Sequence, residues 1–157
     1  MISVRLKDAD ATYRFGTALG EAAVPGLVFA VEGNLGSGKT TLAQGVARGL
    51  SVPLDHYVNS PTFAILLTHP GRLQFHHMDL YRLGCLDEAY GIGLDEVIGS
   101  DGVSFIEWPS QVPDLIPQDV VSIRLDYAGD QRQVFLAASG SRSSSFLARC
   151  AYLNTFS

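Results

Sequence analysis

Apolar and polar residues form short patterned segments along the chain that predict strands separated by helices. Ile2 to Leu6 alternates strictly, which is typical of a strand with one buried face. Leu27 to Val31 is a continuous apolar run, as expected for a parallel strand covered by helices on both faces. Val103 to Glu107 is a second apolar run that predicts another strand.

Helical spacing follows the first two strands. Ala11 to Ala23 carries apolar residues four apart, and Asp10 is predicted to cap its N-terminus. Lys39 to Leu50 predicts a second helix, and Leu86 to Ile98 predicts a mixed helix and turn region interrupted by glycines.

Two antiparallel hairpins complete the predicted sheet. The first joins strands at 63–68 and 73–79 through a turn at 69–72, and the second joins strands at 120–127 and 133–138 across Gly129-Asp130. The order of elements predicts a single α/β domain whose sheet has a parallel centre and antiparallel edges.

The length of 157 residues corresponds to one domain, which we place at residues 1–138. The serine-rich segment Ser139 to Ser145 is predicted to be a flexible link. The remaining tail, Phe146 to Ser157, is compatible with a short helix or with an ordered tail without one.

The amino-acid composition and the net charge argue against several classes of function. The net charge of −5 argues against a surface that itself binds nucleic acid. No apolar run approaches the roughly 20 residues of a membrane helix, and the charged N-terminus lacks a signal-peptide core, so we expect a cytoplasmic location and no membrane partner. Cys85 and Cys150 form no disulfide or metal-site pattern and are predicted to be packing residues.

The segment GNLGSGKT at residues 33–40 matches the phosphate-binding loop, and it lies between a predicted strand and a predicted helix. Glycines allow backbone conformations in which successive amides point into one concavity, at a helix N-terminus that favours an anion. Lys39 can reach the β- and γ-phosphate oxygens, and the Thr40 hydroxyl is placed to bind Mg²⁺. A glycine-rich turn without a ligand is the alternative interpretation.

A metal at this loop needs an acidic partner, and two predicted strands end in one: Asp79 and Glu107. The alternatives are a helix cap or a partner of Arg82 for Asp79, and a solvated loop carboxylate for Glu107. His76 and His77 are adjacent on a strand and point to opposite faces, so we expect one packed and one exposed histidine rather than a shared metal site.

Four motifs occur in order: GNLGSGKTT at 33–41, SPTF at 60–63, HMDLYRL at 77–83 and IEWP at 106–109. Together they resemble the TsaE family, the small ATPases of bacterial tRNA threonylcarbamoyladenosine biosynthesis, from about Leu6 to Leu136. The departures are mild: Asn34, Ser37 and Phe63 stand where the family usually has aspartate, alanine and tyrosine. None of these departures removes a phosphate or metal ligand.

The resemblance implies a single three-layer domain of the P-loop NTPase type that binds ATP or ADP with Mg²⁺. It implies metal ligation by Thr40 and Glu107, with Asp79 as a second acid that binds the metal directly, through water, or positions the attacking water. Lys39, Asp79 and Glu107 would be the catalytic residues. The implied nucleotide-binding residues are Gly33, Gly36, Ser37, Gly38, Lys39, Thr40, Thr41, Thr62 in a nucleotide-sensing switch, Trp108 and Arg132. An ordinary core position remains the alternative for Trp108, and Arg132 with residues 9–12 would approach the adenine.

The implied activity is ATP hydrolysis, weak alone and dependent on partners, that resets the TsaD–TsaB pair. The chain would meet tRNA indirectly, chiefly through those partners, with a local basic patch as the alternative. Two other classes of protein are alternatives that also carry a phosphate-binding loop. One is a small-molecule kinase, and the other is a nucleotide-binding interaction module with negligible turnover. A kinase generally needs an arginine-rich lid, and no such segment lies between Leu83 and Ser110.

Overall fold

The computed structural model describes residues 1–157 and contains one seven-stranded sheet in the order β1-β7-β6-β2-β5-β4-β3. The strands are β1 (Ile2–Leu6), β2 (Val28–Gly33), β3 (Leu66–His69), β4 (Phe75–Asp79), β5 (Val103–Glu107), β6 (Val120–Ala128) and β7 (Gln131–Ser139). The helices are α1 (Ala9–Ala22), α2 (Lys39–Gly49), α3 (Leu86–Gly91), α4 (Leu94–Val97) and α5 (Ser141–Arg149), with short 3₁₀ turns η1 (Pro109–Gln111), η2 (Pro113–Leu115) and η3 (Ala151–Thr155).

The sheet is mixed, as its sequence pattern predicts. β6, β2, β5 and β4 run parallel at the centre, while β1, β7 and β3 are added antiparallel at the edges. The predicted α/β class with a parallel centre and antiparallel edges is therefore confirmed.

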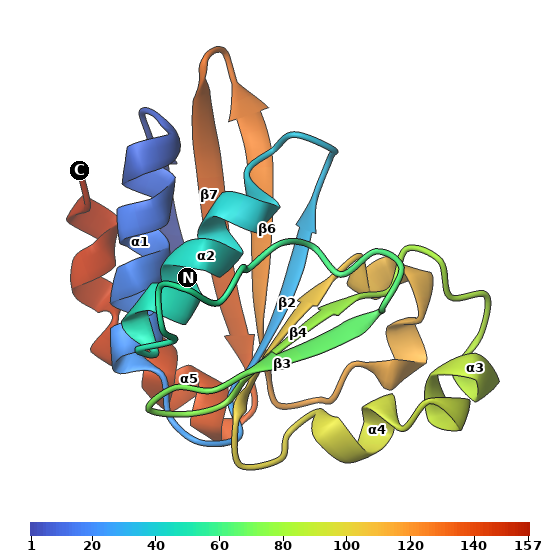
Figure 1. Ribbon diagram of the computed structural model, residues 1–157. Helices are drawn as coiled ribbons and strands as arrows, with labels where there is room; N and C mark the ends of the chain where they lie inside the picture. Colours follow the sequence, from blue (N-terminus) through green and yellow to red (C-terminus); the bar gives the residue numbers. More distant parts are fainter.

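Helices cover the sheet on two sides, which gives three layers (Figure 1). α1, α2 and α5 enclose the larger core against one face, and α3, α4 and the η1–η2 segment enclose a smaller core against the other. Phe29 and Val31 of β2 enter the larger core, whereas Val28 and Ala30 enter the smaller one. This double burial explains why β2 is a continuous apolar run. None of the helices has the length and apolar character needed to cross a bilayer.

Two element boundaries differ from the sequence prediction. Asp8, not Asp10, caps α1: its side chain accepts a hydrogen bond from the Ala11 amide, while Asp10 lies inside the first turn and pairs with Arg14. β3 begins at Leu66, and Phe63 stands outside the sheet with 82% of its surface exposed. An aromatic residue of high strand propensity thus lies in a loop, because propensity is weak without a packed neighbour.

The serine-rich segment is not a flexible link. Ser141–Arg149 forms α5, and Asp119 accepts hydrogen bonds from the Arg142 and Ser143 amides at the start of this helix. Phe146 and Leu153 are buried in the larger core. The tail therefore folds with the sheet rather than apart from it.

Two further predictions about single residues are wrong. His76 and His77 are both buried, because each face of β4 is covered by a packed layer. Cys85 is exposed at the start of α3 and does not pack, whereas Cys150 is buried as predicted.

We expect acid to destabilise the fold through His76. Burial lowers the pKa of His76 below its ordinary value of 6.5, and its Nδ1 lies 2.9 Å from the Thr68 hydroxyl. The unfolded chain therefore binds the proton more readily, so this contribution is complete above about pH 6.5 and is lost as the pH falls below it. The difference in Tm between wild type and His76→Asn should shrink from pH 8 to pH 5. A difference that is independent of pH would contradict this.

Candidate functional site

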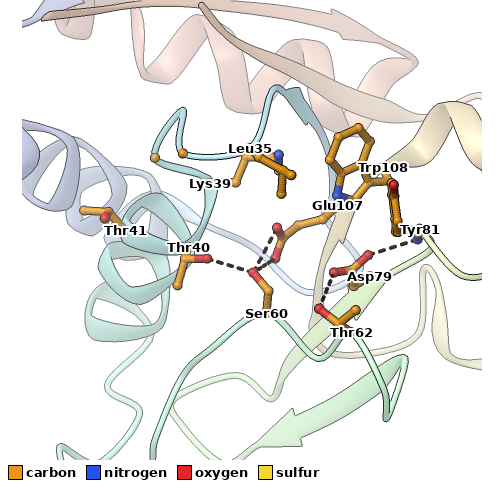
Figure 2. Close-up of a pocket in the computed structure, with 12 residues that line it drawn as sticks. Leu35, Lys39, Thr40, Thr41, Ser60, Thr62, Asp79, Tyr81, Glu107 and Trp108 are labelled. Carbon is orange, nitrogen blue, oxygen red and sulfur yellow. Dashed lines mark hydrogen bonds between the residues drawn. The ribbon is translucent and has the colours of Figure 1, made fainter. Parts of the chain in front are cut away.

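The carboxyl ends of three parallel strands meet at one edge of the sheet and form a cavity of about 390 Å³. Glu107 at the end of β5 lies in register with Asp79 at the end of β4 and with Val31 of β2, next to the loop that follows β2. The cavity is lined by Leu35, Gly36, Gly38, Lys39, Thr40, Thr41, Ser60, Thr62, Asp79, Tyr81, Glu107 and Trp108 (Figure 2). The structure thus brings together most of the residues predicted from the motifs.

The loop between β2 and α2 has the backbone conformation that its glycines allow. Gly36 and Gly38 have φ values of +78° and +107°, and Gly38 is the N-cap of α2. Residues that carry a side chain rarely adopt positive φ values of this size. Glycine is therefore required at both positions for the loop to turn before the N-terminus of α2. Gly33 and Ser37 do not line the cavity; Ser37 is buried behind the loop and packs near Gly33.

Lys39 is folded back onto the loop. Its ammonium donates hydrogen bonds to the Gly33 carbonyl and, at 3.3 Å, to the Asn34 carbonyl. Burial lowers the pKa of Lys39, and the carboxylates of Glu107, Asp79 and Glu32 oppose this shift. A desolvated cation whose hydrogen bonds go only to neutral carbonyls is available to an anion that enters the cavity.

Trp108 lies in the cavity wall, not in a core. Lys39 Nζ sits 4.3 Å from the centre of its ring, and Tyr81 packs on it at 5.0 Å between ring centres. Trp108 has a φ of +56°, which is uncommon for a bulky residue. Trp108 lines the cavity in this uncommon backbone conformation, and its part in nucleotide binding stays a prediction.

A chain of hydrogen bonds connects the loop to Glu107 (Figure 2). The Thr40 and Ser60 hydroxyls lie 2.7 Å apart, and Ser60 Oγ is 2.8 and 3.0 Å from the two Glu107 oxygens. His77 Nε2 lies 2.5 Å from Glu107 Oε2 on the other side. The Ser60 hydroxyl thus stands between the two groups predicted to hold Mg²⁺.

Asp79 connects two loops at the cavity rim. Its carboxylate accepts hydrogen bonds from the Thr62 hydroxyl at 3.3 Å and from the Tyr81 amide at 2.9 Å. Burial raises the pKa of Asp79, the Glu107 carboxylate adds to this, and the two hydrogen bonds oppose it. The segment of Thr62 and the segment of Tyr81 therefore share one carboxylate.

The donor set fits a hard cation that retains other oxygen ligands. No group of three or more histidine, cysteine or acidic side chains converges anywhere in the chain, so no all-protein cage exists. One hydroxyl and one or two carboxylates beside an anion-binding loop suit Mg²⁺, which usually binds with phosphate and water.

Arg132 lies outside the main cavity, behind the loop. It donates to the Ser37 and Gly36 carbonyls at 3.0 and 3.2 Å and packs over Tyr127. A smaller cavity of about 150 Å³ joins it to residues of α1; this cavity is lined by Asp8, Ala9, Thr12, Gly36, Ser37, Gly38, Thr41, Asp130 and Arg132. The residues expected near the adenine are thus neighbours of the loop, and their role stays a prediction.

Sequence reasoning missed the roles of Ser60 and His77. Ser60 lies in the SPTF motif but makes its contacts across 20 and 47 positions of the chain. His77 shares a strand face with Asp79, two residues later, and that spacing could have indicated that both point toward Glu107.

Comparison with known proteins identifies the family. A family model described as threonylcarbamoyl adenosine biosynthesis protein TsaE matches residues 6–134. The chain belongs to the TsaE family. A TsaE protein of Bacillus subtilis is 41% identical over 122 residues, which cover 76% of this chain and 75% of that protein. A TsaE protein of Treponema pallidum is 36% identical over 132 residues, 83% and 96% of the two chains. Both relatives carry the name tRNA threonylcarbamoyladenosine biosynthesis protein TsaE.

The fold of this TsaE protein is also similar to a solved structure. The crystal structure of Bacillus subtilis YdiB superimposes with a TM-score of 0.84 at 29% sequence identity, over 98% of this chain and 96% of that one. Because the match covers nearly the whole chain, it includes the C-terminal α5 that lies beyond the family model.

Proposed function

We propose that this TsaE protein is a Mg²⁺-dependent ATPase that supports tRNA threonylcarbamoyladenosine biosynthesis by acting on a TsaD–TsaB complex. One observation carries the proposal: Lys39 and Thr40, at the start of α2, face Asp79 and Glu107 across a single cavity. The names of the relatives support the pathway, and family membership supports the partners.

Each residue has a role that follows from its position. Lys39 exchanges the carbonyls of Gly33 and Asn34 for the β- and γ-phosphate oxygens, which are stronger acceptors because they are charged. Thr40 and Glu107 would hold Mg²⁺, which would supply positive charge beside the phosphate oxygens. Asp79 completes the metal site or orients the attacking water.

Hydrolysis should be slow without partners. The cavity lining contains no arginine, and Arg82 instead packs over the exposed ring of Phe63 at 4.4 Å. Phosphoryl transfer is often completed by a cation supplied by another protein. The loop of Thr62 and Phe63 is exposed beside the cavity and is tied to Asp79, so it is suited to transmit the nucleotide state to a partner.

The proposal is tested by ATP turnover of the purified protein alone, with TsaD–TsaB, and with Glu107→Ala. We expect low phosphate release alone, an increase with the pair, and loss with the variant. Phosphate transfer to a metabolite would replace the proposal with a kinase. Tight nucleotide binding with no phosphate release, even with the pair present, would leave only a binding module.

Nucleotide binding should change the fluorescence of Trp108, the only tryptophan of the chain. The Lys39 ammonium lies over the indole ring, and it has to leave this position to reach a phosphate. Titration with MgADP or MgATP should therefore alter the emission, and Lys39→Met should remove the response. Unchanged emission at a concentration where calorimetry shows saturation would contradict this arrangement.

A further inference from the structure

His77 is a buried polar residue that no motif-based role explains. It lies within β4, its side chain is 0% exposed, and its Nε2 contacts Glu107 Oε2 at 2.5 Å. Its other ring nitrogen, Nδ1, is buried and has no hydrogen-bond partner. A buried nitrogen without a hydrogen-bond partner lowers the stability of the fold. The contact with Glu107 is therefore the interaction that explains why a histidine occupies this position.

The surroundings fix the direction of this hydrogen bond. The imidazole is packed between aromatic rings, with centre distances of 5.5 Å to Phe75 and 5.4 Å to Phe105. An ionised carboxylate only accepts hydrogen bonds, so Nε2 carries the hydrogen and donates it to Glu107. The packed rings leave the imidazole little freedom to turn, and the donor therefore has a fixed direction.

Glu107 has two side-chain partners of different character. Ser60 comes from the loop before β3 and also contacts Thr40, so a metal ion held by Thr40 and Glu107 competes with Ser60 for the same oxygens. His77 comes from the sheet, on the strand paired with β5, and hydrogen-bonds Glu107 but not Thr40. His77 is thus the partner that can remain when Ser60 is displaced.

We infer that His77 is a positioning residue: through its Nε2–H it holds the Glu107 carboxylate toward Thr40 in the metal-bound state. This inference rests on the proposed function. Partners that orient a metal ligand typically contribute a factor of about 10 to 100 to metal affinity. His76, the residue before it, has no contact with Glu107 and instead forms a hydrogen bond with the Thr68 hydroxyl.

The test compares His77→Gln with His77→Asn. Both variants bury the same polar group, a primary amide, at this position. Only glutamine is long enough to place a hydrogen-bond donor where Nε2 lies. The measurement is the Mg²⁺ concentration that gives half-maximal binding of a fluorescent ADP. His77→Asn should raise this concentration about 10- to 100-fold. His77→Gln should stay close to wild type, and ADP binding in EDTA should be the same in all three.

His76→Asn is the matched control, since it makes the same change one residue away on the opposite face. It should leave the Mg²⁺ dependence at the wild-type value. A His77→Asn protein with wild-type Mg²⁺ dependence overturns the inference, and so does an equal shift in His77→Gln or His76→Asn. A wild-type protein whose ADP binding does not respond to Mg²⁺ overturns the proposed function itself, which is a separate result.

Discussion

Lys39→Ala should weaken ATP binding by about 100-fold or more while leaving the protein folded. Each hydrogen bond from a charged donor contributes about 1.5–3 kcal/mol, and the ammonium is placed to make two of them to a triphosphate. The fold should tolerate the change, because the desolvated ammonium makes its hydrogen bonds to the carbonyls of Gly33 and Asn34, and its contact with an aromatic ring is to Trp108 in the cavity wall. Calorimetric titration with MgATP measures the affinity, and a thermal melt checks the fold.

Arg48→Ala is the matched control for Lys39→Ala. It removes the same charge from the same helix, but Arg48 is exposed at the far end of α2. Its affinity for MgATP should equal that of wild type. Comparable losses in the two variants would mean that net charge, and not the position of Lys39, determines binding. Glu107→Ala should instead affect the Mg²⁺ dependence and turnover more than nucleotide docking.

Gly45→Ala should lower the stability of the protein by about 2 kcal/mol. A Cβ at Gly45 would lie 2.2 Å from the Tyr13 carbonyl oxygen of α1, and a Cβ at Gly20 would lie 2.2 Å from the Val46 carbonyl oxygen of α2. These obstacles are backbone atoms, which cannot rotate away, so the two helices have to separate. This cost exceeds the roughly 1 kcal/mol that alanine gains over glycine in a helix. Thermal or denaturant unfolding measures the loss.

Gly91→Ala provides the comparison. Gly91 is also helical, in α3, but a Cβ there would meet nothing within 4 Å. This variant should be neutral or slightly stabilised by reduced freedom of the unfolded chain. A stabilised Gly45→Ala protein would contradict the close packing of α1 against α2 described above. Because α2 carries Lys39 and Thr40 at its start, we also expect weaker nucleotide binding in Gly45→Ala.

The parts of the fold that local pattern determines were predicted well. The run at β2 and the strict alternation at β1 identify strands, and GNLGSGKT identifies the loop, because each is encoded within about ten residues. The failures involve contacts between distant segments. α5 has few apolar residues and is held by Asp119 and the core, and Asp8 and Asp10 are indistinguishable as caps without the backbone.

The site shows the same division. Lys39, Thr40, Asp79 and Glu107 were found because a motif or a strand end marks each of them. The hydroxyl of Ser60 reaches Thr40 and Glu107 only after a long loop has folded across the sheet, and the loop path cannot be read from composition. The burial of His77 likewise depends on the ring of Phe105, which comes from the neighbouring strand β5 and contacts His77 only once the sheet has formed.

The pairing of β1 with β7 bears on how the protein forms during its synthesis. Ile2 lies opposite Leu136, so β1 leaves the ribosome well before its partner strand has been made. At about 5–20 residues per second, translation of the intervening segment takes roughly 7 to 27 s. During that time the apolar face of β1 has no sheet edge to join, which makes the nascent chain a substrate for chaperones until β7 arrives.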